Sequence, residues 1–266
     1  MAIHPTAIVS PESVLGQNVE IGPYSIVCVG ARIGRNTRIM SHVVIEKNTR
    51  IGEGCQIFSG VVLGTPAQVR GTGPVNSFVE IGDNNVIREN ATIHSPMKDG
   101  SKTILGNGNL LMVNAHVAHD CVLGHHIVLS NNVALGGHVT VGDGAVLGGF
   151  VGVHQYVRIG KLSMLGGLSK TTMDVAPFSI YDGHPAKFRG VNVMGLRRAG
   201  FSQAHRSEIK KALQALFGRR TNLSRAITGV EIEFKHNPEV QSVIHFIRES
   251  KRGVGRAMTA VSMTEE

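Results

Sequence analysis

The chain has 266 residues with 42% hydrophobic content, 33 glycines and no tryptophan, which suits one large domain or a large domain with a small one. Its formal charge of +8 favours an anionic partner, without choosing among nucleic acid, a phosphate-bearing substrate, an acidic protein and a membrane surface. No apolar run approaches the roughly 18 residues that span a bilayer and the N-terminus lacks a secretory signal, so we expect no integral membrane segment.

Aliphatic residues recur every six positions along most of the chain, in a single phase that covers twenty-five positions. The series occupies residues 3–63, 81–93 and 105–165, and glycine often follows the aliphatic residue. A helix repeats near 3.6 residues and a strand near 2, so a period of six indicates a short strand plus a turn. Each repeat buries its aliphatic side chain only against neighbouring repeats, so we predict a stacked β-helix over residues 1–172.

The six-residue period resembles the hexapeptide-repeat family of proteins. Members of that family fold as left-handed parallel β-helices with three hexads per coil, and they usually associate as trimers. The resemblance implies that residues 18 apart in this sequence stack on one another.

Two stretches interrupt the period. Residues 64–80 and 94–104 carry proline, glycine and polar residues in place of the regular aliphatic positions. We predict that both are loops that leave the coil. Long loops on a rigid scaffold are common sites of function.

The last third of the chain carries helix signals. Ser202 is a predicted N-cap for a run with apolar residues at helical spacing, and Gly218 is its predicted end. Asn237 is a second predicted cap, with Pro238 at the first helical position and Gly253 as the predicted end. Two helices are therefore expected in this part.

Residues 222–236, between these two helices, predict a weaker helix that is interrupted at Gly229. The chain is accordingly expected to continue from the β-helix through a connection at residues 173–191. A small C-terminal α-helical domain is then expected over residues 192–266.

A cluster of polar residues is predicted on one edge of the β-helix. With 18 residues per coil, His119 lies one coil below Gly137 and two coils below Gln155. His138 and His154 are the immediate neighbours of those two positions. Three coils stacked at about 4.8 Å span roughly 10 Å, which is the size of an active site.

His119 is the strongest catalytic candidate because Asp120 follows it directly. A histidine titrates near neutral pH and can remove a proton from a substrate hydroxyl, while an adjacent carboxylate orients its ring. Gly137 on the next coil can present a backbone N–H to an oxyanion. No serine is placed as a nucleophile, so direct attack by the substrate fits better than a covalent acyl-enzyme.

A zinc site is the competing interpretation of the histidines, since hexapeptide-repeat carbonic anhydrases hold zinc at trimer edges. Its candidate ligands are His116, His119 and His138. The helical tail and the motifs described next favour another chemistry, and we expect no metal and no cofactor.

Further motifs run through nearly the whole chain. They include "IHPTAIV", "NLLMVNAHVAHDC", "LSNNVALGGHV", "GVHQYVRIG" and "GVNVMGLRRAGFS". Together they resemble the UDP-N-acetylglucosamine acyltransferase family of lipid A synthesis. The resemblance implies transfer of an (R)-3-hydroxyacyl chain from acyl carrier protein to the sugar 3-hydroxyl. It also implies a cytoplasmic homotrimer that works without metal or cofactor.

The resemblance also implies roles for individual residues. His119 matches the general base, Asp120 the residue that orients it, and Gly137 the amide that stabilises the oxyanion. The remaining positions that match substrate-binding residues around this centre are His94, His116, His138, His154, Gln155 and Gln68.

Positions near residue 165 and residue 195 match two other parts of the family's site. Asn192 and Arg198 match residues that contact the nucleotide, and an arginine suits a pyrophosphate because its fork gives charge-assisted hydrogen bonds. Gly167 falls where the family sets acyl length, and a glycine there predicts a long chain. Met164 is expected to line the same groove.

The sequence departs from the family's pattern in the first loop. The family typically carries a Gln-Asp-x-Lys run there, whereas this chain keeps Gln68 but has Val69 for the acid and Gly71 for the lysine. Arg70 can supply the positive charge if the loop shifts by one residue. Near the nucleotide positions, an acidic and a second basic residue are replaced by Met194 and Ala199.

These departures leave two other functions open. One is a paralogue that acylates a 3-amino sugar or another nucleotide sugar. The other is a non-catalytic β-helix that binds a nucleotide sugar or the carrier protein. Nucleic-acid binding is not expected, because aromatic residues make up only 5% of the chain and are not interleaved with basic ones.

Overall fold

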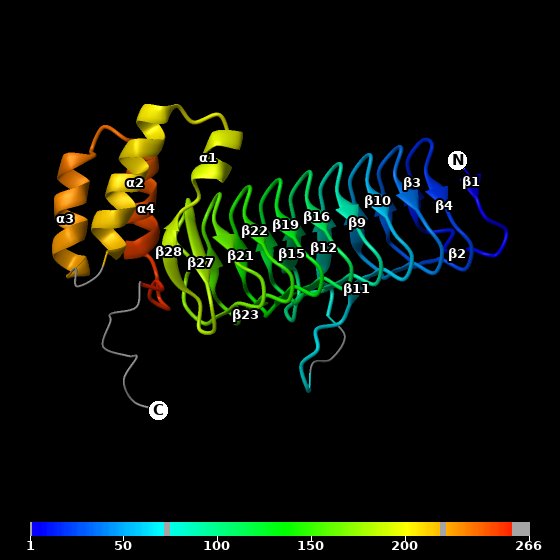
Figure 1. Cartoon of the computed structure of the whole chain (residues 1–266). Coiled ribbons are helices and arrows are strands. Elements are labelled where there is room, and N and C mark those ends of the chain that lie inside the picture. Colours follow the sequence, from blue (N-terminus) through cyan, green and yellow to red (C-terminus); the bar gives the residue numbers. More distant parts are fainter. Residues whose placement is uncertain (1, 72–74, 219–221, 257–266) are drawn as a thin grey trace.

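The structure, a computed structural model, describes residues 2–71, 75–218 and 222–256. These residues form a long left-handed parallel β-helix that begins at the N-terminus and is followed by helices packed at its other end (Figure 1). The fold class predicted from the six-residue period is confirmed, because the hexads form short strands stacked in three parallel sheets.

The three sheets are the three faces of a prism, and successive hexads visit them in turn. Sheet A contains, in stacking order, β1 (Ala2–Ile3), β4 (Glu20–Ile21), β7 (Arg38–Ile39), β10 (Gln56–Ile57), β13 (Val86–Ile87), β16 (Leu110–Leu111), β19 (Val128–Leu129), β22 (Val146–Leu147), β25 (Met164–Leu165), β27 (Ser179–Asp182) and β28 (Lys187–Val191). Sheet B contains β2 (Ile8–Val9), β5 (Ile26–Val27), β8 (Val44–Ile45), β11 (Val62–Thr65), β14 (Thr92–His94), β17 (His116–Val117), β20 (Ala134–Leu135), β23 (Gly152–Val153) and β26 (Lys170–Thr171). Sheet C contains β3 (Val14–Leu15), β6 (Arg32–Ile33), β9 (Thr49–Ile51), β12 (Phe78–Ile81), β15 (Lys102–Leu105), β18 (Val122–Leu123), β21 (Thr140–Val141) and β24 (Arg158–Ile159).

The register shows where the coil is regular and where it is interrupted. Ile3 pairs with Ile21, and His116 with Ala134, so an uninterrupted coil has 18 residues. Leu63 instead pairs with Ile93, and Ile81 with Leu105, because a loop has been inserted in each of those coils. The described residues between the flanking strands are 66–71 and 75–77 at the first interruption and 95–101 at the second, so the strands extend a little into both predicted loop stretches.

Most corners of the β-helix contain one residue with a left-handed backbone. Asn18, Asn36 and Asn114 adopt φ values of 57°, 57° and 60° at such corners. Asparagine, aspartate, histidine and glycine tolerate this conformation best, which explains why they recur at this position. The inward aliphatic residues form the core, and Ile57 and Leu111 in the middle of the stack are fully buried.

The β-helix ends in a hairpin that carries the helices. β27 adds to sheet A parallel to β25, and β28 then returns antiparallel to β27. The helices that follow are α1 (Val193–Arg198), α2 (Gln203–Phe217), α3 (Leu223–Glu233) and α4 (Pro238–Arg248). Phe217 of α2 packs on Phe188 of β28 with 5.1 Å between the ring centroids, which joins the helices to the sheet.

The helix boundaries follow most of the capping signals. Ser202 and Asn237 cap α2 and α4 through their side chains, and Gly218 follows the last residue of α2. α3 is continuous through Gly229, because one glycine weakens a helix without breaking it when the helix is packed on its neighbours. α4 ends at Arg248 and not near Gly253, and the amide of its C-cap residue Glu249 donates to the carbonyl of His245.

Within the described residues, no helix combines the length and the apolar composition that crossing a bilayer requires.

Candidate functional site

The central histidine lies at a corner of the β-helix, between β17 of sheet B and β18 of sheet C. Asp120 occupies the left-handed position of this corner, with φ of 58°, and His138 occupies the same position one coil later, with φ of 59°. This backbone turns the two side chains toward each other across adjacent coils. The 18-residue coil therefore places both groups at the same corner of two adjacent coils.

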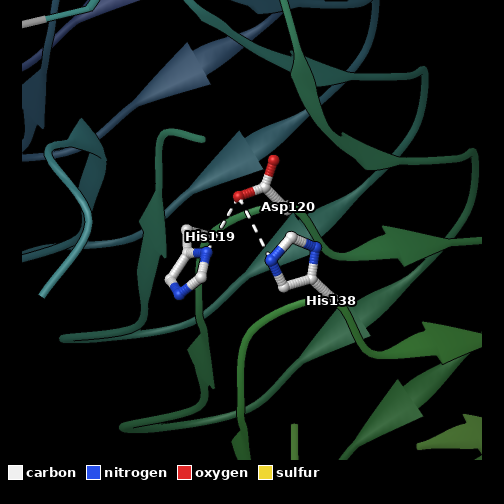
Figure 2. Close-up of side chains that lie close together, drawn as sticks. All are labelled: His119, Asp120 and His138. Carbon is white, nitrogen blue, oxygen red and sulfur yellow. Dashed lines mark hydrogen bonds and ion pairs between the residues drawn. The ribbon is translucent and has the colours of Figure 1, made fainter. Parts of the chain in front are cut away.

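His119 and Asp120 form a direct hydrogen bond (Figure 2). The Nδ1–H of His119 donates to Oδ2 of Asp120 over 2.8 Å, and the two side chains are only 11% and 12% exposed. Low exposure strengthens this interaction and fixes the ring. Within the described part of the chain, Nε2 of His119 has no hydrogen-bond partner, so it is the nitrogen left for a ligand.

Asp120 is held by three further contacts. Its amide donates to the hydroxyl of Thr103 over 2.9 Å, and its Oδ2 accepts from the amide of Met97 over 3.2 Å. Nε2 of His138 lies 3.9 Å from the same oxygen. Figure 2 shows both histidine rings directed at this carboxylate. Met97 belongs to the second inserted loop, so that loop helps to position the carboxylate.

The ring of His138 is fixed by stacking. It lies parallel to the ring of Tyr156 with 4.5 Å between centroids, and edge-on to the ring of His119 at 5.2 Å. Sequence reasoning missed Tyr156, although the 18-residue period places it one coil above His138.

Gly137 faces the ring of His119 from the next coil. A Cβ at this position would lie 2.5 Å from both Cε1 and Nε2 of His119, so no other residue fits without moving the ring. The amides of Gly136 and His138 on either side donate to backbone carbonyls, whereas the Gly137 amide has no acceptor among the described residues. A free N–H therefore lies beside the open nitrogen of His119.

Two more histidines lie on sheet B beside this corner. Nδ1 of His94 donates to the carbonyl of Pro66 over 2.8 Å, and Nδ1 of His116 lies 2.8 Å from the hydroxyl of Thr92. Burial lowers the pKa of His116, and the charge of the neighbouring His94 lowers it further. Both effects disfavour the protonated form of His116.

A cavity of about 480 Å³ opens over this cluster. The predicted site residues that line it are Gln68, His94, His116, His119, Gly137 and His154. Val69 also lines it, beside Gln68. Arg70 and Gly71 belong to the same loop but not to the lining, and neither do Gln155 and His138, although His138 reaches the site through Asp120.

The cavity floor includes one charged residue that sequence reasoning missed. Ala134, Gly152 and Lys170 stack in register above His116 on sheet B, and all four line the cavity. The signal was present, because these residues follow His116 at intervals of 18. Ala134, Gly152 and Lys170 lie on the flat face of the sheet, so the pattern of histidines at the corner does not point to them.

The residues expected to contact the nucleotide lie at a different edge. Asn192 and Arg198 line a second cavity, of about 870 Å³, formed by sheet A and the helix α1. Met164, which was expected in the acyl groove with Gly167, lines this cavity as well. Met194 and Ala199 line it too. The side chain of Asn192 caps α1 by accepting from the amide of Gly195, and Gly167 lines neither of these two cavities.

The side chains closest to a metal-binding arrangement are His119, Asp120 and His138. Their ligand atoms lie within 4.8 Å of one another, whereas His116, a candidate ligand on sequence grounds, is not part of this group. Nδ1 of His119 already donates to Asp120, and a metal there would have to replace that proton. The hydrogen-bonded pair therefore fits proton transfer more directly than metal ligation.

Two family descriptions match parts of the chain. The family model described as UDP N-acetylglucosamine O-acyltransferase, domain 2, matches residues 174–255. The model described as bacterial transferase hexapeptide (six repeats) matches residues 30–65.

Curated relatives match the sequence over part of their length. The acyl-[acyl-carrier-protein]–UDP-N-acetylglucosamine O-acyltransferase of Gloeothece citriformis is 41% identical over 154 residues, which cover 58% of this chain and 55% of that protein. The protein of the same name from Synechocystis is 40% identical over 159 residues, with 60% and 57% covered. The match thus spans little more than half the length of these relatives.

Solved structures match this chain over nearly its whole length and over nearly the whole of their own. The UDP-N-acetylglucosamine acyltransferase from Campylobacter jejuni is 34% identical, with a TM-score of 0.90, 96% of this chain covered and 100% of that chain. That of Bacteroides fragilis is 38% identical, with a TM-score of 0.92 and coverages of 95% and 99%. That of Francisella novicida is 31% identical, with a TM-score of 0.93 and both chains covered to 99%.

Proposed function

Because this chain belongs to the UDP-N-acetylglucosamine acyltransferase family, we propose that it transfers an acyl group from acyl carrier protein to UDP-N-acetylglucosamine. The group is an (R)-3-hydroxyacyl chain and the acceptor is the 3-hydroxyl of the sugar, which is the first step of lipid A biosynthesis. The observation that carries this proposal is the His119–Asp120 pair, whose open nitrogen lies beside a free glycine amide in a large cavity.

His119 acts as the general base in this mechanism. Its Nε2 takes the proton of the sugar hydroxyl as the oxygen attacks the thioester carbonyl, so a C–O bond forms directly and no acyl-enzyme is made. The hydrogen bond from Nδ1 to Asp120 holds the tautomer that leaves Nε2 able to accept, and the carboxylate stabilises the imidazolium that forms.

Gly137 acts on the oxygen of the thioester. Attack converts the carbonyl into a tetrahedral oxyanion, and the free N–H of Gly137 donates to it. When the intermediate collapses, the C–S bond breaks and the proton on His119 passes to the departing sulfur. The products are the acylated sugar nucleotide and the carrier with a free thiol.

We propose that the two cavities are brought together in a cytoplasmic homotrimer. The first cavity lies on sheet B and the second on sheet A, at different edges of the same prism. A three-fold assembly that sets sheet B of one subunit beside sheet A of the next lets one substrate contact both. A mixture of His119→Ala and Arg198→Ala chains would then regain activity that neither variant has alone.

A 3-amino sugar is a second candidate acceptor, because the lining of the cavity departs from the family's pattern beside Gln68. Val69 lies beside Gln68 where the family typically has an acid, and none of the residues that line this cavity carries a carboxylate. The acceptor end therefore differs from the family's pattern, while the catalytic pair is intact.

A transfer assay tests both acceptors. Purified chain is given 3-hydroxyacyl carrier proteins of several lengths with UDP-N-acetylglucosamine or its 3-amino analogue, and products are resolved by mass. Transfer to the hydroxyl sugar supports the first proposal, and transfer to the amino sugar alone supports the second. Transfer to neither contradicts both and leaves a binding protein.

A further inference from the structure

A single lysine marks the far end of the cavity floor. The outward-facing residues of sheet B stack there in register as His116, Ala134, Gly152 and Lys170. Strands in a sheet are about 4.8 Å apart, so Lys170 stands roughly 14 Å along the floor from His116. It is too distant to act on the reacting atoms and is placed to contact a remote part of a substrate.

Lys170 supplies the permanent charge of this cavity. The cavity is lined wholly by described residues, and among them Lys170 is the only lysine or arginine, while none is acidic. Its side chain is exposed and forms no ion pair with any described residue. An unpaired ammonium in a cavity without carboxylates is complementary to an anion.

Only small residues lie on the cavity floor between His116 and Lys170. Ala134 has a single methyl group, and a Cβ built at Gly152 would meet nothing within 4 Å. A ligand that begins at His119 can therefore lie along sheet B as far as Lys170 without a side chain in its way.

We propose that Lys170 is a phosphate-binding residue that sets the affinity of this cavity for the anionic end of a substrate. This inference rests on the proposed acyl transfer, in which both substrates carry phosphate. One source is the pyrophosphate of the sugar nucleotide, and the other is the phosphodiester of the carrier's phosphopantetheine arm. Lysine binds either as a point charge.

Steady-state kinetics of Lys170→Met distinguish the two sources. We expect KM for one substrate to rise about tenfold, equivalent to about 1.4 kcal/mol, with kcat nearly unchanged because the reacting atoms are remote. A rise in KM for the sugar nucleotide identifies the pyrophosphate, and a rise in KM for the acyl carrier identifies the phosphodiester. Lys170→Arg, which keeps the charge, should recover most of the affinity.

A matched control removes one positive charge from a lysine that lies outside the cavity. Lys187→Met, on β28, should leave both KM values unchanged. Added salt should also raise the affected KM more in the wild-type chain than in Lys170→Met, because salt screens the charge that the variant lacks. Equal KM values in Lys170→Met and wild type, or an equal effect of Lys187→Met, would overturn the inference.

Direct binding separates this inference from the proposed reaction. Calorimetry with UDP and with 4′-phosphopantetheine is run on the wild-type chain and on Lys170→Met. If the wild-type chain transfers no acyl group but Lys170→Met loses affinity for one of these probes, the reaction is wrong and the phosphate site stands. If Lys170→Met binds both probes as the wild type does, or the wild type binds neither, the phosphate site is wrong.

Discussion

Two corners of the β-helix share one backbone geometry and use it in opposite ways. At the corner from sheet C to sheet A, side chains of one coil accept from amides of the coil below. The amides of Asp83, Asn107 and His125 donate to Asn107, His125 and Asp143 over 2.8, 2.9 and 2.8 Å. At the corner from sheet B to sheet C, the equivalent residues are His119, Gly137 and Gln155, and the Gly137 amide has no acceptor among the described residues.

The difference lies in the residues at one position of the hexad. In the ladder of Asp83, Asn107, His125 and Asp143, the side chain of each coil accepts from the amide of the coil below. Glycine at position 137 leaves the ring of His119 uncovered, and among the described residues Gln155, one coil above, does not accept from the Gly137 amide. The same fold thus makes one edge whose polar groups hydrogen-bond to one another and one edge whose polar groups stay available to a ligand. Substitutions at matched positions should therefore affect stability at the first edge and turnover at the second.

The largest expected effect is that of His119→Ala. Removing the general base should lower kcat by about 10³-fold, because proton transfer by a positioned side chain contributes roughly 10²–10⁴-fold. The melting temperature should change little. His125→Ala, at the equivalent position of the other corner, is the control and should retain activity. Equal activity of the two variants would contradict the role of His119.

The next effect is that of Gly137→Ala. The added methyl group would lie 2.5 Å from the ring of His119 and must displace it from the site. We expect kcat to fall about 10²-fold, a loss typical of a damaged oxyanion site. Gly149→Ala is the control, since its methyl group would meet only the carbonyl of Asn131 at 3.5 Å and should be tolerated. An active Gly137→Ala variant would show that the ring and amide are not jointly required.

A smaller effect is expected from Thr103→Val. The hydroxyl of Thr103 accepts from the amide of Asp120, and its loss releases the residue that orients His119. We predict a fall in kcat of about tenfold, because small displacements of catalytic groups are costly. Thr103→Ser keeps the hydroxyl and should behave like the wild type. If Val and Ser variants are equally active, this hydrogen bond does not position the pair.

Stability, not turnover, should respond to His125→Ala. The variant leaves the amide of Asn107 without its acceptor on a partly solvated edge, which costs about 1 kcal/mol. Denaturant unfolding should measure this loss as a lower midpoint with an unchanged slope. His125→Asn, which keeps an acceptor, is the control. An unchanged midpoint in His125→Ala would show that water satisfies the freed amide.

The smallest effect concerns pH. Burial and His94 lower the pKa of His116 in the folded chain, so below pH 6.5 the unfolded chain binds the proton more readily. Stability from this residue is therefore complete above pH 6.5 and decreases as the pH falls through the folded pKa. His116→Asn should flatten that decrease in unfolding measured between pH 7 and pH 5. The same slope in both chains would assign the dependence to other groups.

Much of the site was predictable because the period of six converts sequence distance into spatial distance. His119, Gly137 and His154 were expected together, and one cavity contains all three. The two cavities were not expected to be separate within one chain. Asn192, Arg198 and Met164 depend on how the hairpin β27–β28 and α1 fold back along sheet A, and no repeat extends to those elements.

The sequence by itself determined the β-helix, its loops and the His119–Asp120 pair, because each of these depends on local period and on adjacent residues. Only the tertiary structure decided which polar groups satisfy one another and which stay open. It placed Met97 of a loop on the carboxylate of Asp120, Tyr156 on the ring of His138, and Lys170 at the end of the cavity. Such contacts join residues of different coils and loops, and their geometry is set by the packed core as a whole.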